Sequence, residues 1–177
     1  MSSGGVANDR HHPIVDRSPV LSLAATLAMV LVLALLLANE EIQIEGSAGW
    51  AASLPTWRID GSWLLDVFWG GRTMTGYHVY IFSFVALFFH FPFAFSWRWS
   101  WRAEAQAFAA ISLFWVAEDF LWFVLNPAYG LAKFAPASIP WHHHWLFGAP
   151  TDYWVGLLSC AVLGAVAARS GTTPAQV

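Results

Sequence analysis

Hydrophobic residues gather in four long runs along the chain, and polar or aromatic-rich connections separate them. The first run, residues 20–38, carries no charge and is long enough to cross a hydrocarbon core of about 30 Å at about 1.5 Å per residue. Three later runs, residues 77–95, 103–125 and 151–168, have similar lengths and few polar residues. The pattern predicts an all-α integral membrane protein in which four transmembrane helices form a small bundle.

The segments outside the apolar runs set the domain organisation. Residues 1–17 and 171–177 are polar and lack apolar side chains to bury, so we expect a disordered N-terminal tail and a polar C-terminal tail around one domain at residues 18–170. Arg10 and Arg17 precede the first run, as in a signal peptide. The run is longer than the roughly 7 to 15 residues of a signal core, and no cleavage site follows, so we expect a retained helix.

The first and third connections are unlike ordinary short loops. Residues 39–76 begin with three glutamates, and tryptophans, glycines and prolines follow. Residues 126–150 combine aromatic side chains with three consecutive histidines. Within them, residues 62–69 and 131–139 are typical of interfacial segments, which lie on a membrane rather than across it.

Basic residues predict the orientation of the chain. They lie near the spans in the N-terminal tail, in the second connection and at the C-terminus, namely Arg10, Arg17, Arg98, Arg102 and Arg169. By the positive-inside rule both termini are cytoplasmic in a bacterial-type inner (plasma) membrane. The first and third connections then share the outer face.

Composition narrows the class of protein and its partners. Only 11% of the residues are charged and 58% are hydrophobic, against about 25% charged in ordinary globular proteins. The 12 Trp and 14 Phe suit interfacial belts, so the expected partner is the lipid bilayer, together with a membrane-protein partner or a second copy. A net charge of −3 with scattered basic residues argues against nucleic acid. The single Cys160 excludes an internal disulfide.

Two adjacent acids, Glu118 and Asp119, interrupt the third apolar run. A carboxylate deep in a bilayer costs roughly 2.5 to 3.5 kcal/mol on insertion scales and usually has a partner or a function. Both acids lie in the outer half of the predicted helix, shortly before Leu125. We therefore expect them to be the catalytic or ligand-binding carboxylates.

The histidines supply candidate partners for these acids. His142, His143 and His144 are consecutive, and in an extended segment the first and third project to one side and the second to the other. His78 starts the second span at the same outer face and is expected to meet Glu118 or Asp119. His90 lies near the cytoplasmic end of that span, so no role is assigned to it.

Three further polar residues are expected around the histidines. Asn126 precedes a proline that ends the third helix, and Gly130 accepts a positive φ, so the chain would fold back over the outer mouth. Asp152 and Tyr153 begin the fourth span and would orient a histidine as second-layer partners. Asp152 also suits a helix N-terminus, which alone would explain it.

These residues lead to a metal-binding hypothesis. Imidazole nitrogens with carboxylate oxygens suit zinc, iron, copper or manganese, so the predicted ligands of a divalent metal are His78, His142, His143, His144, Glu118 and Asp119. If the protein is an enzyme, metal-activated water or a metal-bound oxygen species would act on a lipid-like or apolar substrate. The sequence contains no HExxH, GxSxG, Walker A or GxGxxG motif, nor the histidine boxes of membrane desaturases.

Four alternatives stay open. The histidines would simply face lipid headgroups if Trp141 and Trp145 anchor an interfacial belt. The protein would be a non-enzymatic accessory or scaffold subunit of a larger membrane complex if its aromatic faces pack on a partner. Haem would bind through a pair such as His78 with His143. A proton-coupled carrier would use Glu118 or Asp119 as its titrating group.

Overall fold

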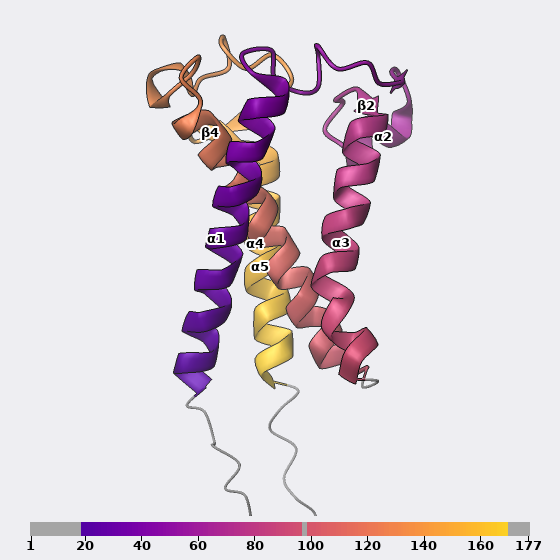
Figure 1. The fold of residues 1–177 in the computed structure, drawn as a ribbon, viewed down its shortest axis with the longest axis vertical. Coiled ribbons are helices and arrows are strands. Elements are labelled where there is room, and N and C mark those ends of the chain that lie inside the picture. The colour runs from indigo at the N-terminus through magenta and orange to yellow at the C-terminus, as the bar shows by residue number, and fades with distance from the viewer. Residues whose placement is uncertain (1–18, 97–98, 170–177) are drawn as a thin grey trace, which may run out of the picture.

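The computed structural model describes residues 19–96 and 99–169, and the predicted tails at residues 1–17 and 171–177 lie outside these ranges. The described chain is mostly helical, and four of its helices are long and apolar enough to span a membrane. They run antiparallel to their sequence neighbours, with the start of the first and the end of the last at the same end (Figure 1). The four are α1 (Pro19–Glu45), α3 (Gly76–Ser96), α4 (Trp101–Leu125) and α5 (Thr151–Arg169).

The short elements gather at the opposite end, where the first and third connections lie (Figure 1). In the first connection β1 (Arg58–Ile59) pairs antiparallel with β2 (Met74–Thr75), and α2 (Trp63–Phe68) lies between them. In the third, β3 (Trp145–Leu146) pairs antiparallel with β4 (Ala149–Pro150), after the 3-10 turn η1 (Leu131–Lys133). We refer to this end as the loop end.

The first helix is longer than the sequence pattern predicts. Its predicted end was residue 38, whereas α1 continues to Glu45. The glutamates that we expected at the start of a loop therefore occupy its last two turns. Glu41 and Glu45 lie one turn apart on the face that meets the other helices, and Glu40 stays exposed. Polar residues are tolerated in a spanning helix when they face protein rather than lipid.

Helix α4 is the element on which the other spanning helices pack. Small residues let α1 approach it closely: Ala34 and Ala38 are fully buried. Ala34 packs in one core cluster with Phe114, and Ala38 packs in a second cluster with Phe123. By contrast, α3 buries few residues and contacts mainly α4.

The two ends of α4 are fixed by local chemistry. At its start the Ser100 hydroxyl accepts a hydrogen bond from the Ala103 N–H at 3.1 Å, which satisfies one free donor of the first turn. At its end Asn126 leaves the helical conformation before a proline. Gly130, with φ of 66°, then donates its N–H back to the Phe123 carbonyl at 3.0 Å. This turn brings the third connection back over α4, where Ile139 is fully buried.

A glycine on α5 permits its close approach to α4. A Cβ atom at Gly156 would lie 2.5 Å from Val116 Cγ2, whereas one at Gly164 would meet nothing within 4 Å. We expect Gly156→Ala to lower the free energy of unfolding by about 1 to 3 kcal/mol, because the stiff valine cannot yield. Thermal unfolding in detergent measures this.

Gly164→Ala is the matched control, since both changes add the same methyl group to the same helix. Better helix propensity should leave it unchanged or up to about 1 kcal/mol more stable. Equal stabilities for the two variants would contradict the described packing.

Candidate functional site

A cavity of about 440 Å³ lies between the spanning helices and extends from the loop end toward their middle. All four helices and both long connections contribute to its wall. Five carboxyl groups line it, from Glu41, Glu45, Glu118, Asp119 and Asp152. Most of the remaining wall is aromatic or aliphatic, and Arg72, His78, Ser112 and Ser159 add polar groups. The aromatic and aliphatic residues include Trp50, Trp69, Phe82, Trp115, Val116, Trp122, Trp141 and Val155.

The glutamates of α1 meet Glu118 of α4 inside this cavity. Glu41 Oε1 accepts a hydrogen bond from the Tyr77 hydroxyl at 2.8 Å, and Glu45 Oε1 accepts one from the Ala51 N–H at 2.5 Å. The carboxyl groups of Glu41 and Glu118 lie close together on the cavity wall. Glu118 is only 3% exposed, and its Oε1 has no partner among the described residues.

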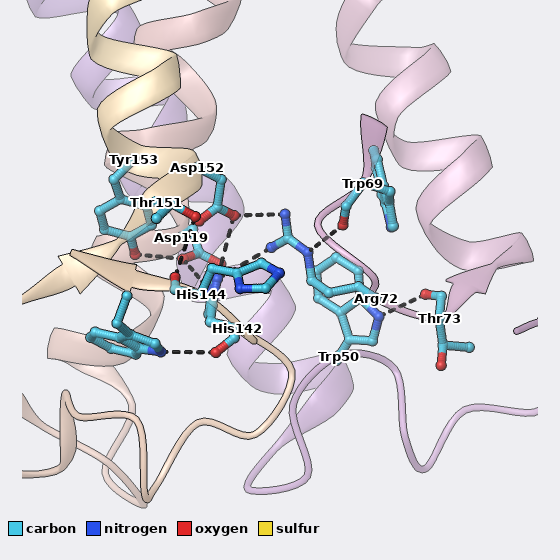
Figure 2. Close-up of polar contacts among 11 residues, drawn as sticks. Trp50, Trp69, Arg72, Thr73, Asp119, His142, His144, Thr151, Asp152 and Tyr153 are labelled. Carbon is cyan, nitrogen blue, oxygen red and sulfur yellow. Dashed lines mark hydrogen bonds and ion pairs between the residues drawn. The ribbon is translucent and has the colours of Figure 1, made fainter. Parts of the chain in front are cut away.

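Asp119 belongs to a second group that lies closer to the loop end. Its Oδ2 accepts a hydrogen bond from the Tyr153 hydroxyl at 2.5 Å and lies 3.2 Å from His142 Nε2. On the other side of the imidazole, Nδ1 is 3.3 Å from Asp152 Oδ2. The same Asp152 oxygen receives Arg72 Nη2 at 2.6 Å (Figure 2). Two carboxylates thus alternate with two cationic groups.

His142 is the histidine whose charge this arrangement determines. Burial alone would lower its pKa, but the charge of Asp119 and the close approach of both carboxylates outweigh burial and raise the pKa to about 9. Arg72 opposes the rise, and its Nη1 lies 3.4 Å from Nδ1. We assign Asp152 as the acceptor that both cations share. At neutral pH His142 is then an imidazolium, so both of its ring nitrogens carry a hydrogen.

Aromatic rings hold the Arg72 guanidinium at the mouth of the cavity. Its central carbon lies 4.7 Å from the Trp50 ring centre and 5.8 Å from that of Trp69. His78 stacks on Trp50 with 3.9 Å between ring centres. Flat rings around a desolvated guanidinium are a favourable cation–π arrangement, which orients Arg72 toward Asp152.

The structure brings together five of the residues singled out in the sequence. Glu118, Asp119, Asp152 and Tyr153 line one cavity, and His142 contacts two of them. The third connection does fold back over α4, as the turn residues predict. Tyr153 donates a hydrogen bond to Asp119, and Asp152 lies in ion-pair contact with His142.

The other predicted site residues lie differently. His78 lines the cavity, but its Nδ1 is 2.6 Å from the Thr75 hydroxyl, and no hydrogen bond or ion pair joins it to Glu118 or Asp119 within residues 19–96 and 99–169. The expected pairing of His78 with these acids stays a prediction; in the structure the ring is held by the Thr75 hydroxyl and by stacking on Trp50. Asn126 is buried, and its side chain binds the Gly46 carbonyl at 2.8 Å, so it joins α1 to α4.

The three consecutive histidines have different surroundings. His142 is buried, whereas His143 and His144 are exposed. The His144 carbonyl accepts the Thr151 N–H at 2.9 Å, so this residue fixes the approach to α5 through its backbone. Within the described part of the chain, no three His, Cys, Asp or Glu side chains are placed to hold one metal ion.

Sequence reasoning missed four residues of the site: Glu41, Glu45, Arg72 and Tyr77. One signal existed for the glutamates, because Glu41 and Glu45 are four residues apart and would share one face of a continued helix. In the structure this face continues that of the buried residues 30, 34 and 38. Arg72 had no such signal, since its position depends on how the first connection folds.

His90 lies at the end of the helices remote from the cavity. Its Nε2 is 3.0 Å from Glu104 Oε1, and its Nδ1 is 2.6 Å from the Ala86 carbonyl. The Trp99 indole donates to the other Glu104 oxygen at 2.8 Å. These contacts join α3 to the start of α4, which is a structural role.

Comparison with protein-family models, with curated proteins and with solved structures gave no match. The fold defines a multi-pass membrane protein with a polar cavity among its spanning helices. Its function is therefore argued from the geometry of that cavity.

His142 should make stability depend on pH. Its folded pKa of about 9 exceeds an unfolded value of about 6.5, so its contribution is complete below pH 6.5 and is lost as pH rises through 9. We expect the free energy of unfolding to fall by roughly 2 to 3 kcal/mol across this window, with a falling Tm in detergent.

The variant His142→Gln should be less stable at pH 6.5 and should show little change between pH 6.5 and 9. His143→Gln alters an exposed neighbour and should keep the wild-type profile. A wild-type profile in His142→Gln would show that the imidazolium is not held between the two carboxylates.

Proposed function

We propose that this protein is a small four-helix bundle of a bacterial-type inner membrane that binds the cationic head of a small amphipathic molecule in its cavity. In this proposal both termini are cytoplasmic, and interfacial segments of the first and third connections cover the cavity at the outer face. The observation that carries the proposal is Glu118, a nearly fully buried acid with an unpartnered oxygen on a cavity wall.

The charge around the cavity favours a cation. Five carboxyl groups line it, and the cationic groups in contact with them are Arg72 and His142, which pair with Asp119 and Asp152. The three glutamates Glu41, Glu45 and Glu118 have no cationic partner in residues 19–96 and 99–169. An unpaired carboxylate in a low-dielectric site is costly, so it either takes up a proton or attracts a cation.

The remaining wall favours an organic cation with an apolar part. Indole rings attract ammonium groups through their faces, and Trp115, Trp122 and Trp141 border the cavity. Phe82 and Val155 add apolar surface. A volume of about 440 Å³ also lies within the roughly 300 to 1,000 Å³ usual for small-molecule sites.

Two indole N–H donors on the cavity wall favour a ligand that also carries a hydrogen-bond acceptor. The Nε1 atoms of Trp69 and Trp122 are buried, border the cavity and have no acceptor within the described residues. A ligand with a hydroxyl or carbonyl oxygen near its ammonium group would satisfy them, because buried donors without partners are costly. The proposed ligand class is thus a small alkylammonium that carries such an oxygen.

The metal hypothesis stays a prediction, and the site chemistry favours it less than an organic cation. A protonated His142 forms ion pairs with two carboxylates, and the exposed His143 and His144 are not among the residues that line the cavity. Haem ligation, a catalytic role for Glu118 and Asp119, and an accessory role in a larger complex likewise stay predictions.

Tryptophan fluorescence tests the proposal, since several indoles border the cavity. Phenyltrimethylammonium should quench or shift the emission of the detergent-purified protein saturably. Its uncharged isostere tert-butylbenzene should bind at least tenfold more weakly, a difference of about 1.4 kcal/mol. The variant Glu118→Gln should weaken ammonium binding by a similar factor.

Glu40→Gln removes an exposed carboxyl group from α1 and should leave the affinity unchanged. Equal binding of the charged and uncharged compounds, or full affinity in Glu118→Gln, would contradict a cation site. Elemental analysis of the same preparation tests the metal hypothesis, which stoichiometric zinc, iron, copper or manganese would support instead.

A further inference from the structure

The cavity has two parts that differ in chemistry. Its carboxyl groups lie toward the loop end, whereas the part farther from that end is lined by α3, α4 and α5. On α4 the lining continues to Ser112, six residues before Glu118, which is about 9 Å along the helix axis. We call this part the deep arm, and define it by Phe82 and by the cavity-lining residues within 112–116 and 155–159.

The deep arm follows one face of α4 and one face of α5. The lining positions 112, 115, 116 and 119 on α4 and 152, 155, 156 and 159 on α5 have the spacing of a single helix face. Phe82 forms the wall on the side of α3 and packs against Trp115 with 4.0 Å between ring centres. None of the residues that define the deep arm is charged. This part of the cavity therefore suits an apolar group.

The deep arm reaches the outer surface of the helices between α3 and α5. In the described residues both helices pack on α4, and neither packs extensively on the other. Val155 borders the cavity and is nevertheless 63% exposed, in a helix long and apolar enough to span a membrane. An apolar chain in the deep arm can thus continue between α3 and α5 into a surrounding bilayer.

The loop end of the cavity is occupied by a cation of the protein itself. Arg72 lies against the rings of Trp50 and Trp69 and pairs with Asp152 at 2.6 Å. An apolar chain directed toward this end would have to displace that ion pair. In the described part of the chain no ion pair crosses the deep arm, so a chain directed there displaces none.

We infer that the ligand of this cavity is a membrane amphiphile, a long-chain alkylammonium whose head binds at Glu118 and whose alkyl chain lies in the deep arm. The inference rests on the proposed cation site and extends its ligand by a chain. Charge argues against a phospholipid in the same place. Five carboxyl groups line the cavity and would repel a phosphate, and Arg72 is already paired with Asp152.

A series of alkyltrimethylammonium ions tests the position of the chain on the full-length protein in detergent. Ethyl-, butyl- and octyltrimethylammonium differ only in chain length, and their competition with phenyltrimethylammonium is followed by tryptophan fluorescence. The octyl compound should bind roughly tenfold or more tightly than the ethyl compound, because each buried methylene adds favourable transfer free energy. Equal affinities along the series would overturn the inference and leave the cation site intact.

Octylphosphocholine tests the charge of the head. It has the same octyl chain and a trimethylammonium group, but it also carries a phosphate. It should bind roughly tenfold or more weakly than octyltrimethylammonium, because the carboxyl groups of the cavity repel the phosphate. Equal or tighter binding of octylphosphocholine would identify a phospholipid as the occupant and overturn the inferred class.

Ser159→Phe fills the deep arm from α5 without altering an acid. It should weaken binding of the octyl compound roughly tenfold, since the chain loses its buried position. The ethyl compound should bind as in the wild type, which also shows that the variant is folded. Ala161→Phe places the same ring at an exposed position of α5 outside the cavity wall and should keep both affinities. Unchanged octyl binding in Ser159→Phe would contradict a chain in the deep arm.

The outcomes distinguish this inference from the proposed function. Binding of the ethyl and phenyl compounds without a gain for the octyl compound overturns the inference alone. Absence of binding by every ammonium compound overturns the inference together with the cation site. The chain-length series uses the wild-type protein, so it decides the matter even where Ser159→Phe does not fold.

Discussion

Burial of carboxyl groups among apolar helices is the constraint on which this structure depends. Glu41, Glu45 and Glu118 lie in segments long and apolar enough to span a membrane, and none of them contacts a cation in the described residues. Each needs hydrogen-bond donors or a proton, because an isolated charge in such surroundings is costly. The tyrosine of α3 and the backbone after α1 supply donors to the two α1 acids.

The ion pairs nearer the loop end join the two long connections to the spanning helices. Arg72 arrives from the first connection and His142 from the third, whereas the carboxylates that they bind belong to α4 and α5. These contacts therefore join segments far apart in the sequence (Figure 2). The Asp152 side chain is 37% exposed, so solvent screens its ion pairs more than it would those of a fully buried carboxylate. Even so, the network stabilises the connections over the cavity.

The sequence was informative wherever one physical rule decided the outcome. The length of the predominantly apolar runs placed α3, α4 and α5 within two residues of their observed ends. Asn126, the following proline and Gly130 predicted that the third connection returns over α4, because the backbone limits at those residues are local. The acids of α4 could be recognised as site residues by the cost of their burial alone.

The features that the sequence did not predict depend on tertiary packing. Whether α1 ends at residue 38 or at Glu45 depends on the partners of its last two turns, and these lie on α3 and α4. His142 and His144 were expected to share one side, but β3 and β4 turn the segment so that only His142 is buried. The position of Arg72 depends on stacking with Trp50, which has no periodic signature in the sequence.

The division of polar residues into two groups has a functional consequence. Asp119 and Asp152 are neutralised by side chains of the protein, so a ligand that displaced those side chains would have to replace two ion pairs. Glu118 offers an oxygen without a partner among the described residues, so occupying it displaces no ion pair. In the proposed cation site a ligand therefore gains more at Glu118 than at either aspartate. Closure of the cavity is assigned to Asp119 and Asp152 and recognition of the ligand to Glu118, so binding at Glu118 leaves in place the ion pairs that hold the connections.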